Sequence, residues 1–418
     1  MATNFFMTAP PCGVLFRLWK DYFLLSVTKL QNFQIISPNT LNKSDDTYNG
    51  PPYINREIES RRRSKMDRRT FLKGAAYGLA LISIPVRTTS GTGLRDRKSL
   101  KLTYSTNLAF KDTTRLWVPA PTNATYQRLV DLEIETNASK VLLTKDDVYQ
   151  APIVYLEFQS GSEKKFAEVS FYVEIWNRDS INWKTLPSNN TKIPEDVAFY
   201  LKPTQHIQTD GIVKEYADKI TKGAKTDLQK AKAIYDWVVE NTFRDPKVLG
   251  CGVGDVKSML ESGYFGGKCT DINSLFVALC RASGIPAREI FGLRVLTSKL
   301  SEGISKVQGD ATKAQHCRAE FYLGKWIPAD PADVRKLMLE EKLDLNHPKV
   351  KRIRNFMFGG WDVHWVAFNY ARDFQLKPPM SSGEFLNEFM YPVAEVEGKM
   401  INKFTLTFEY SKYTVQVL

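Results

Sequence analysis

The chain has 418 residues, 43% of them hydrophobic, so it is long enough for two globular domains and too apolar to be disordered throughout. Its net charge of +12 is uneven: residues 1–97 hold 15 Lys and Arg against 7 Asp and Glu, and the remainder holds 43 against 39. A body so nearly balanced, with no basic stripe interleaved with aromatic residues, argues against nucleic acid as a partner.

The first 97 residues are predicted to contain a targeting signal and no folded domain. Residues 1–65 lack helical or strand periodicity, and we expect a disordered leader or an over-long gene model. Residues 66–97 resemble a twin-arginine export signal, because Arg68 and Arg69 precede Phe-Leu-Lys and a weakly apolar stretch too short to span a bilayer comfortably. The alternative is a basic flank before a buried helix. The signal implies the twin-arginine machinery as a partner and a periplasmic or envelope location.

Whether this signal is cleaved stays open, since no clear A-x-A site follows Val86. An uncleaved signal would be the chain's expected contact with a membrane.

Residues 98–190 are expected to form an antiparallel β-sandwich. Alternating apolar and polar residues mark short strands at 100–104, 114–118, 154–158 and 167–175, separated by Pro and Asn-rich turns. Because no polar chemistry clusters in it, we interpret this region as a packing or recognition module.

After a polar, Pro-containing linker the pattern changes to helices. A capping-box sequence at Thr226 opens a helix that ends near Phe243, and Trp237 on it is predicted to be core rather than site. A second apolar helix begins at Cys269 and stops at Gly284-Ile285-Pro286, before a strand at 287–295.

Two short segments, 315–320 and 326–331, are predicted to pair as a hairpin around Leu323-Gly324-Lys325. That pairing would place His316 across from Asp330, with Asp333 as the reserve carboxylate. Strand alternation puts His316 on one face and Cys317 on the other, so Cys317 is expected to be core.

Cys269 has the position that a thiol nucleophile needs. The N-terminus of a helix favours a thiolate, and a neighbouring imidazolium would favour it further. Each residue alone is weak evidence, but a thiol, an imidazole and a carboxylate in compatible elements predict together a Cys269, His316, Asp330 triad. The five cysteines show neither CxxC spacing nor His-rich neighbours, so we expect no metal, no cofactor and no disulfide scaffold.

The motifs GKCTD, LFVALCRASGIPAR, HCRAE and WIPADP together resemble the core of the transglutaminase-like superfamily over about residues 205–335. The resemblance implies an α+β, papain-like core at 200–335, with Cys269 as nucleophile, His316 as general base and Asp330 as the acid that orients it. The sandwich is similar to one that precedes this core in some exported bacterial members.

Lys268 and Arg318 depart from the family pattern, which predicts a pocket unlike that of the animal cross-linking enzymes. No calcium pattern is visible, and His364 between two Trp residues is the rival imidazole, interpreted as core or rim.

The predicted function is acyl chemistry on an amide through a Cys269 thioester, with a protein or peptide as substrate. Hydrolysis of a peptide or isopeptide bond is the leading reading. Glutamine acyl transfer and a catalytically inactive envelope binding or scaffold module are the alternatives. Residues 336–418 are expected to be β-rich, with strands including 404–410, and to complete the core.

Overall fold

The computed structural model describes residues 14–17 and 97–418, except 162–163, 179–180 and 191. The predicted export signal and nearly all of the leader lie outside the described residues. Within the leader only β1 (Val14–Arg17) is described, and its backbone pairs with β4 (Gln127–Thr136). No helix among the described residues is both long enough and apolar enough to cross a membrane.

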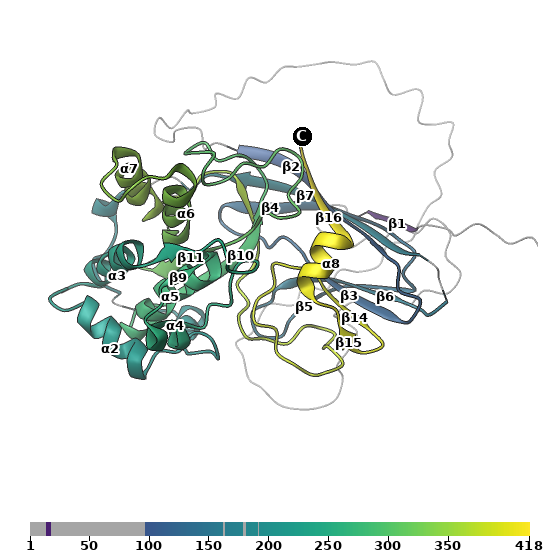
Figure 1. The fold of residues 1–418 in the computed structure, drawn as a ribbon, viewed down its shortest axis with the longest axis horizontal. Coiled ribbons are helices and arrows are strands. Elements are labelled where there is room, and N and C mark those ends of the chain that lie inside the picture. Colours follow the sequence, from purple (N-terminus) through teal and green to yellow (C-terminus); the bar gives the residue numbers. More distant parts are fainter. Residues whose placement is uncertain (1–13, 18–96, 162–163, 179–180, 191) are drawn as a thin grey trace, which may run out of the picture. The chain divides into compact units, whose positions relative to one another are not determined.

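The predicted sandwich is present as two five-stranded antiparallel sheets, ordered β1-β4-β7-β2-β16 and β15-β14-β3-β6-β5 (Figure 1). The remaining strands are β2 (Arg97–Leu108), β3 (Thr114–Pro119), β5 (Lys140–Lys145), β6 (Pro152–Phe158), β7 (Lys165–Trp176), β14 (Val393–Val396), β15 (Lys399–Met400) and β16 (Ser411–Val417).

All four predicted strand segments fall inside β2, β3, β6 and β7. Their alternation is real: in β2, Leu100, Leu102 and Tyr104 are fully buried while their neighbours are not. The apolar faces of the two sheets bury one continuous core, which also takes in Leu293 and Phe368 from outside the sandwich. Period-two patterning was therefore sufficient to identify these strands.

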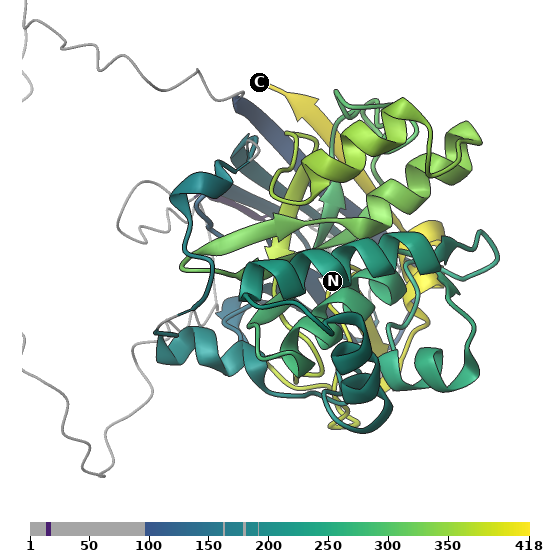
Figure 2. The same cartoon turned by 90° about the vertical axis from the view of Figure 1, so that its left-hand side faces the viewer.

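The second region is built on a four-stranded antiparallel sheet, ordered β12-β11-β10-β13, surrounded by helices (Figures 1 and 2). Its strands are β10 (Ala287–Arg294), β11 (Gln315–Tyr322), β12 (Trp326–Ala329) and β13 (Trp365–Asn369). The helices are α1 (Glu195–Ala198), α2 (Gly211–Ile220), α3 (Asp227–Asn241), α4 (Val256–Ser262), α5 (Cys269–Ala282), α6 (Pro331–Glu341) and α7 (Pro348–Met357). A two-stranded parallel pair, β8 (Phe243–Arg244) and β9 (Gly266–Gly267), completes it.

Helix α5 is the buried centre of this region. Asp271 at its third position accepts the backbone N–H of Lys268 at 2.8 Å, which secures the helix start. The helix ends where Gly284 takes a left-handed conformation (φ 81°) and Ile285 N–H returns to Cys280 at 2.9 Å, so Pro286 can leave in an extended direction. Both predicted ends of the helix are confirmed.

The C-terminal prediction needs correction. Residues 404–410 were expected to be a strand, but the chain forms a helix, α8 (Lys403–Glu409), whose start is capped by Asn402 through N–H bonds from Phe404 and Thr405. The alternation of apolar residues there is too short to exclude a helical turn. Within this segment β13 joins the central sheet, while β14, β15 and β16 extend the sandwich sheets.

Candidate active site

Cys269 is the first residue of α5 and lies 2% exposed beneath a glycine-rich loop. The loop is held over the helix start because Asp271 also accepts the backbone N–H groups of Val253 and Gly254, at 3.0 and 2.8 Å. Gly252 has φ 89°, and a Cβ there would meet the Asp271 carboxylate at 1.9 Å. Only glycine fits this close approach, so Asp271 and the loop together fix where Cys269 sits.

His316 and Asp330 are brought together by β11 and the start of α6. The imidazole Nε2 lies 2.8 Å from Asp330 Oδ2, and both side chains are completely buried. Asp330 caps α6, accepting the N–H of Asp333 at 3.1 Å, and Asn273 on α5 also donates to it at 3.3 Å. The carboxylate therefore has a fixed orientation and can hold one imidazole tautomer in place.

The register differs from the predicted one. Ala319 is opposite Ala329, so β12 ends before Asp330, and His316 pairs instead with Gly292 of β10. Asp330 meets His316 diagonally, from the first position beyond the strand, because the pairing is centred on Gly324 and places Arg318 nearest to the position opposite Asp330. The faces are as predicted: His316 lies on the face of the carboxylates and Cys317 on the face of α5, where Asn273 donates to its carbonyl at 2.9 Å.

Asp333, the reserve carboxylate, also approaches the imidazole, with Oδ2 3.4 Å from Nε2. That oxygen makes no hydrogen bond to any described residue, whereas the other oxygen of Asp333 is paired with Arg294. Burial favours the neutral acid, but the Arg294 and His316 charges hold the pKa of Asp333 well below its usual range. Asp330 is thus the hydrogen-bond partner of His316, and Asp333 is a second negative charge beside it.

The electrostatics favour a charged imidazole. Burial and the nearby Arg294 charge disfavour protonation of His316, but Asp333 and Asp330 outweigh them and raise its pKa to about 9. Burial also raises the pKa of Asp330, with the charge of Asp333 adding to the effect. The second nitrogen of His316, Nδ1, is buried without a hydrogen-bond partner among the described residues.

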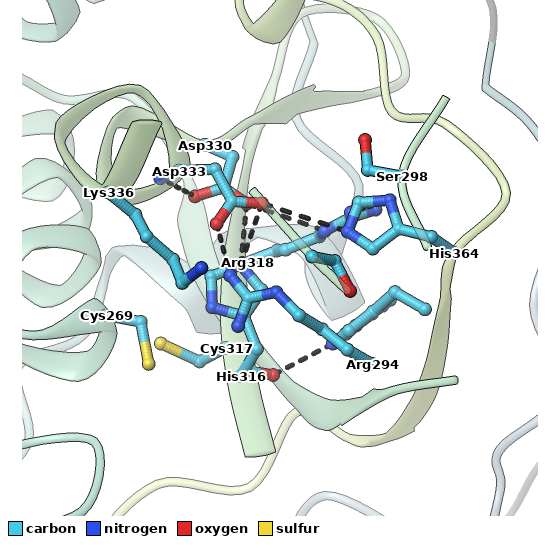
Figure 3. Close-up of polar contacts among 12 residues, drawn as sticks. Cys269, Arg294, Ser298, His316, Cys317, Arg318, Asp330, Asp333, Lys336 and His364 are labelled. Atoms are coloured by element: carbon cyan, nitrogen blue, oxygen red, sulfur yellow. Dashed lines mark hydrogen bonds and ion pairs between the residues drawn. The ribbon is translucent and has the colours of Figure 1, made fainter. Parts of the chain in front are cut away.

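Cys269 has the opposite tendency. Burial disfavours its thiolate, yet the neighbouring Cys251 and Cys317 thiols and the charge of His316 lower the pKa of Cys269 well below its usual range. In Figure 3 the sulfur atoms of Cys269 and Cys317 lie close together beside His316, with Asp330 and Asp333 beyond the imidazole. A thiolate and an imidazolium at this place can act as nucleophile and proton donor.

His364, the rival imidazole, has a different setting. Its Nε2 lies 3.0 Å from Arg318 Nη2, and its Nδ1 contacts the Asp362 carboxylate. Burial outweighs the effect of Asp362 and lowers the pKa of His364 to about 4, so the ring is neutral at pH 7. In Figure 3 the ring lies on the far side of the carboxylates from Cys269.

His316, Asp330 and Asp333 could also supply ligand atoms to a metal ion, since their donor atoms all lie within 4.8 Å of one another. However, the Arg294 guanidinium is paired with Asp333, and Arg318 Nε lies 3.5 Å from Asp330. A divalent cation would therefore have to enter beside two fixed positive charges. The donor set fits an imidazole and carboxylate relay better than a metal centre.

Sequence reasoning missed several residues that shape this site. Asp271 was part of the quoted motif but had no role, and Arg294 and Cys251 were not considered. A carboxylate at the third helical position is a visible capping signal. No sequence signal connects Cys251 or Arg294 to Cys269, because a loop and a strand end bring them there.

Two of the cavities among the described residues bear on the site. One, of about 360 Å³, is lined by Cys251, Lys268 and Gln315, which are immediate neighbours of the Cys269 and His316 positions. The larger, of about 670 Å³, is lined by aromatic residues with Arg178, Arg288 and Glu320, and by none of Cys269, His316 and Asp330. These three residues do not line the smaller cavity either, but its lining includes Lys268 and Gln315, the chain neighbours of Cys269 and His316, so it is the nearer of the two to the thiol.

Comparison with known proteins gives an independent line of evidence. A model described as the transglutaminase-like superfamily matches residues 214–331, which include Cys269, His316 and Asp330. An uncharacterized protein of Haemophilus influenzae is 42% identical over 306 residues, covering 70% of this chain and 83% of that protein.

Solved structures are more distant. A candidate cysteine protease of Cytophaga hutchinsonii is 15% identical, with a TM-score of 0.48, covering 77% of this chain and 91% of its own. The periplasmic domain of TgpA from Pseudomonas aeruginosa is 12% identical, with a TM-score of 0.30, covering 63% and 99%. At such identities and TM-scores, neither likeness says anything about the reaction.

Proposed function

The chain belongs to the transglutaminase-like superfamily, and from this premise we propose that it is a thiol enzyme that hydrolyses peptide or isopeptide bonds through a Cys269 thioester. The observation that carries the proposal is the pairing of opposed pKa shifts, lowered at Cys269 and raised at His316. Such opposed shifts favour a thiolate beside an imidazolium, which a purely structural cluster does not need.

In the proposed reaction the Cys269 thiolate attacks the amide carbonyl carbon. The carbonyl oxygen becomes an oxyanion, for which the backbone N–H of Cys269 at the start of α5 is one available donor. The His316 imidazolium gives its proton to the leaving nitrogen, the C–N bond breaks, and a thioester remains. His316, now neutral, takes a proton from water as the water attacks the thioester, which releases the acid and restores the thiolate.

Asp330 acts on His316 alone in this scheme. Its 2.8 Å contact with Nε2 keeps that nitrogen protonated and leaves Nδ1 for proton exchange with the thiol. Asp333, fixed by Arg294, adds charge that stabilises the imidazolium without occupying the same hydrogen bond. Arg294 favours the ionised form of Asp333, and Arg318 opposes the rise in pKa that burial gives Asp330.

The proposal is tested by treating the protein with a peptide vinyl sulfone and measuring its intact mass, then locating the adduct by peptide mapping. One adduct at Cys269, absent in Cys269→Ala and unchanged in Cys280→Ala, is the expected result. No adduct, or equal labelling of several cysteines, would favour the inactive binding module.

Hydrolysis and acyl transfer diverge only when the thioester is resolved. We therefore expect a thioester formed from an activated acyl donor to release free acid at a rate that added primary amine does not change. A rate that rises with amine, with an amide as the product, would identify the protein as an acyltransferase instead.

Export is proposed on the sequence alone, because residues 66–96 lie outside the described residues. The Arg-Arg-Thr-Phe-Leu-Lys run predicts that a chain beginning at Met66 leaves the cytoplasm by the twin-arginine route. Replacing Arg68 and Arg69 by Lys should retain it in the cytoplasm, as measured by fractionation. Unchanged export of that double variant would remove the signal assignment.

A further inference from the structure

The cavity beside Cys269 is strongly basic. Six of its lining residues are Lys or Arg, and no Asp or Glu is among the described residues that line it. The six are Arg244, Lys268, Arg294, Lys306, Lys313 and Lys336. They come from separate elements, namely β8, the residue before α5, the end of β10, the loop between β10 and β11, and α6, so no single helix or strand face explains them.

Internal ion pairs neutralise only part of this charge. Arg294 is paired with Asp333, and Lys306 with Glu302 at 2.9 Å on the exposed rim. Within the described ranges, no ion pair joins Arg244, Lys268 or Lys313 to a carboxylate. The cavity therefore keeps an excess of positive charge after its internal partners are counted.

The environment of Lys336 shows that the positive charges of this cavity lie close enough to affect one another. Its ammonium is mostly buried, donates to the Gly303 carbonyl at 2.7 Å, and has its nearest carboxylate, Glu340, at 3.9 Å. Desolvation, with the charge of Arg294 adding to it, lowers the pKa of Lys336 to about 8. Asp333 and Glu340 oppose this shift without cancelling it, so the mostly buried ammonium remains unfavourably placed, and an incoming anion would stabilise its charge.

We infer that the substrate is an acidic peptide whose carboxylates lie close to the bond that is cleaved. The inference rests on the proposed function, since it assigns the substrate class of the same site. The cavity's volume, about 360 Å³, lies in the range of small-ligand sites, which is roughly 300–1,000 Å³. Charged walls around a concave site concentrate a ligand of opposite sign and fix its register, so specificity should follow charge more than shape.

Binding to the Cys269→Ala variant tests the inference separately from catalysis. The probes are two fluorescent peptides of one sequence, one carrying Glu and the other Gln at the same positions, followed by fluorescence anisotropy. We expect the Glu peptide to bind at least about tenfold more tightly at low salt, and the difference to shrink as ionic strength rises.

Lys313→Met and Lys336→Met, each made in the Cys269→Ala background, should reduce this preference severalfold. Lys325→Met, which removes a lysine from the larger cavity, is the matched control and should keep it. Equal affinity for both peptides, or a preference indifferent to Lys313 and Lys336, would overturn the inference.

The same two peptides, made as vinyl sulfones, distinguish failure of the proposed hydrolysis from failure of the acidic-substrate inference. If Cys269 reacts with both probes at equal rates, the enzyme proposal stands and the acidic-substrate inference fails. If Cys269 reacts with neither probe while its Ala variant still prefers the Glu peptide, the inference about the ligand stands and the proposed hydrolysis fails.

Discussion

Two buried histidines that both lie next to Asp333 behave in opposite ways. His316 and His364 are both fully enclosed, and each touches an aspartate. His316 has two carboxylates and no arginine donating to its ring, so its pKa rises to about 9. His364 accepts from Arg318, so burial prevails and its pKa falls to about 4. Burial alone does not determine whether a histidine is protonated, because the sign of the nearest charges decides whether its pKa rises or falls.

The largest expected effect on activity is the difference between a His316 variant and a His364 variant. His316→Ala should lower kcat/KM by about 10²–10⁴-fold, because it removes the proton donor and the partner of the thiolate. His364→Gln, which keeps hydrogen-bonding atoms beside Arg318, should stay within a few-fold of the wild type. Steady-state kinetics on one peptide substrate compares them. A larger loss in His364→Gln would make His364 the base.

Substitution of the two carboxylates around His316 should have different effects: loss of Asp330 should lower turnover, and loss of Asp333 should lower stability. Asp330→Asn should lower kcat on the order of 10²-fold, less than the roughly 10⁴-fold cost in a Ser-His-Asp triad, because Asp333 still stabilises the imidazolium. Asp333→Asn leaves the buried Arg294 unpaired and should lower the free energy of unfolding by about 3–5 kcal/mol. Urea denaturation and kinetics on both variants measure these effects, and a reversed pattern would make Asp333 the orienting acid.

The two histidines should also give opposite pH dependences of stability. The folded pKa of His316 is raised, so its contribution is complete below the unfolded value near 6.5 and is lost as the pH rises through about 9. The folded pKa of His364 is lowered, so its contribution is complete above about 6.5 and is lost as the pH falls toward about 4.

Urea denaturation across pH 4–9.5 tests this pair of slopes. His316→Ala should flatten the alkaline limb only, and His364→Gln the acid limb only. If one variant flattens both limbs, the two sites do not titrate independently.

The smallest expected effect concerns the thiol side of His316. The neighbouring Cys251 thiol lowers the pKa of Cys269 and so favours its thiolate. Cys251→Ala should therefore raise the pKa of Cys269 and slow its alkylation at pH 6 a few-fold, with little change at pH 9. Cys280→Ala, far along α5 from the site, is the control. If the pH profile does not change, Cys251 makes no contribution, and only His316 and the helix terminus stabilise the thiolate.

The sequence was sufficient for the elements and the residue types of the site. Alternation located the sandwich strands, and the capping of α5 placed Cys269 at a helix start, because both are local patterns. It could not supply the diagonal meeting of His316 with Asp330, which depends on a hairpin turn and on where β12 stops. The contribution of Arg294 was equally invisible, since it joins Asp333 from 39 residues away.

Helix α8 shows where a local pattern misleads. Its alternating apolar residues suggest a strand, yet Asn402 caps a helix there, and the strands that extend the sandwich are β14 and β15 before it and β16 after it. Over seven residues, tertiary packing overrides a short pattern.

The central claim is that Cys269 is a thiolate paired with the His316 imidazolium, and the rate of alkylation at pH 6 tests it most directly. An ordinary thiol, with a pKa of about 8.5, is almost wholly protonated at that pH and reacts slowly. We predict that iodoacetamide modifies Cys269 ahead of every other cysteine, by peptide mapping, and that His316→Ala removes most of the advantage. Labelling spread evenly over Cys251, Cys269 and Cys317, or a rate at Cys269 that ignores His316, would contradict the account.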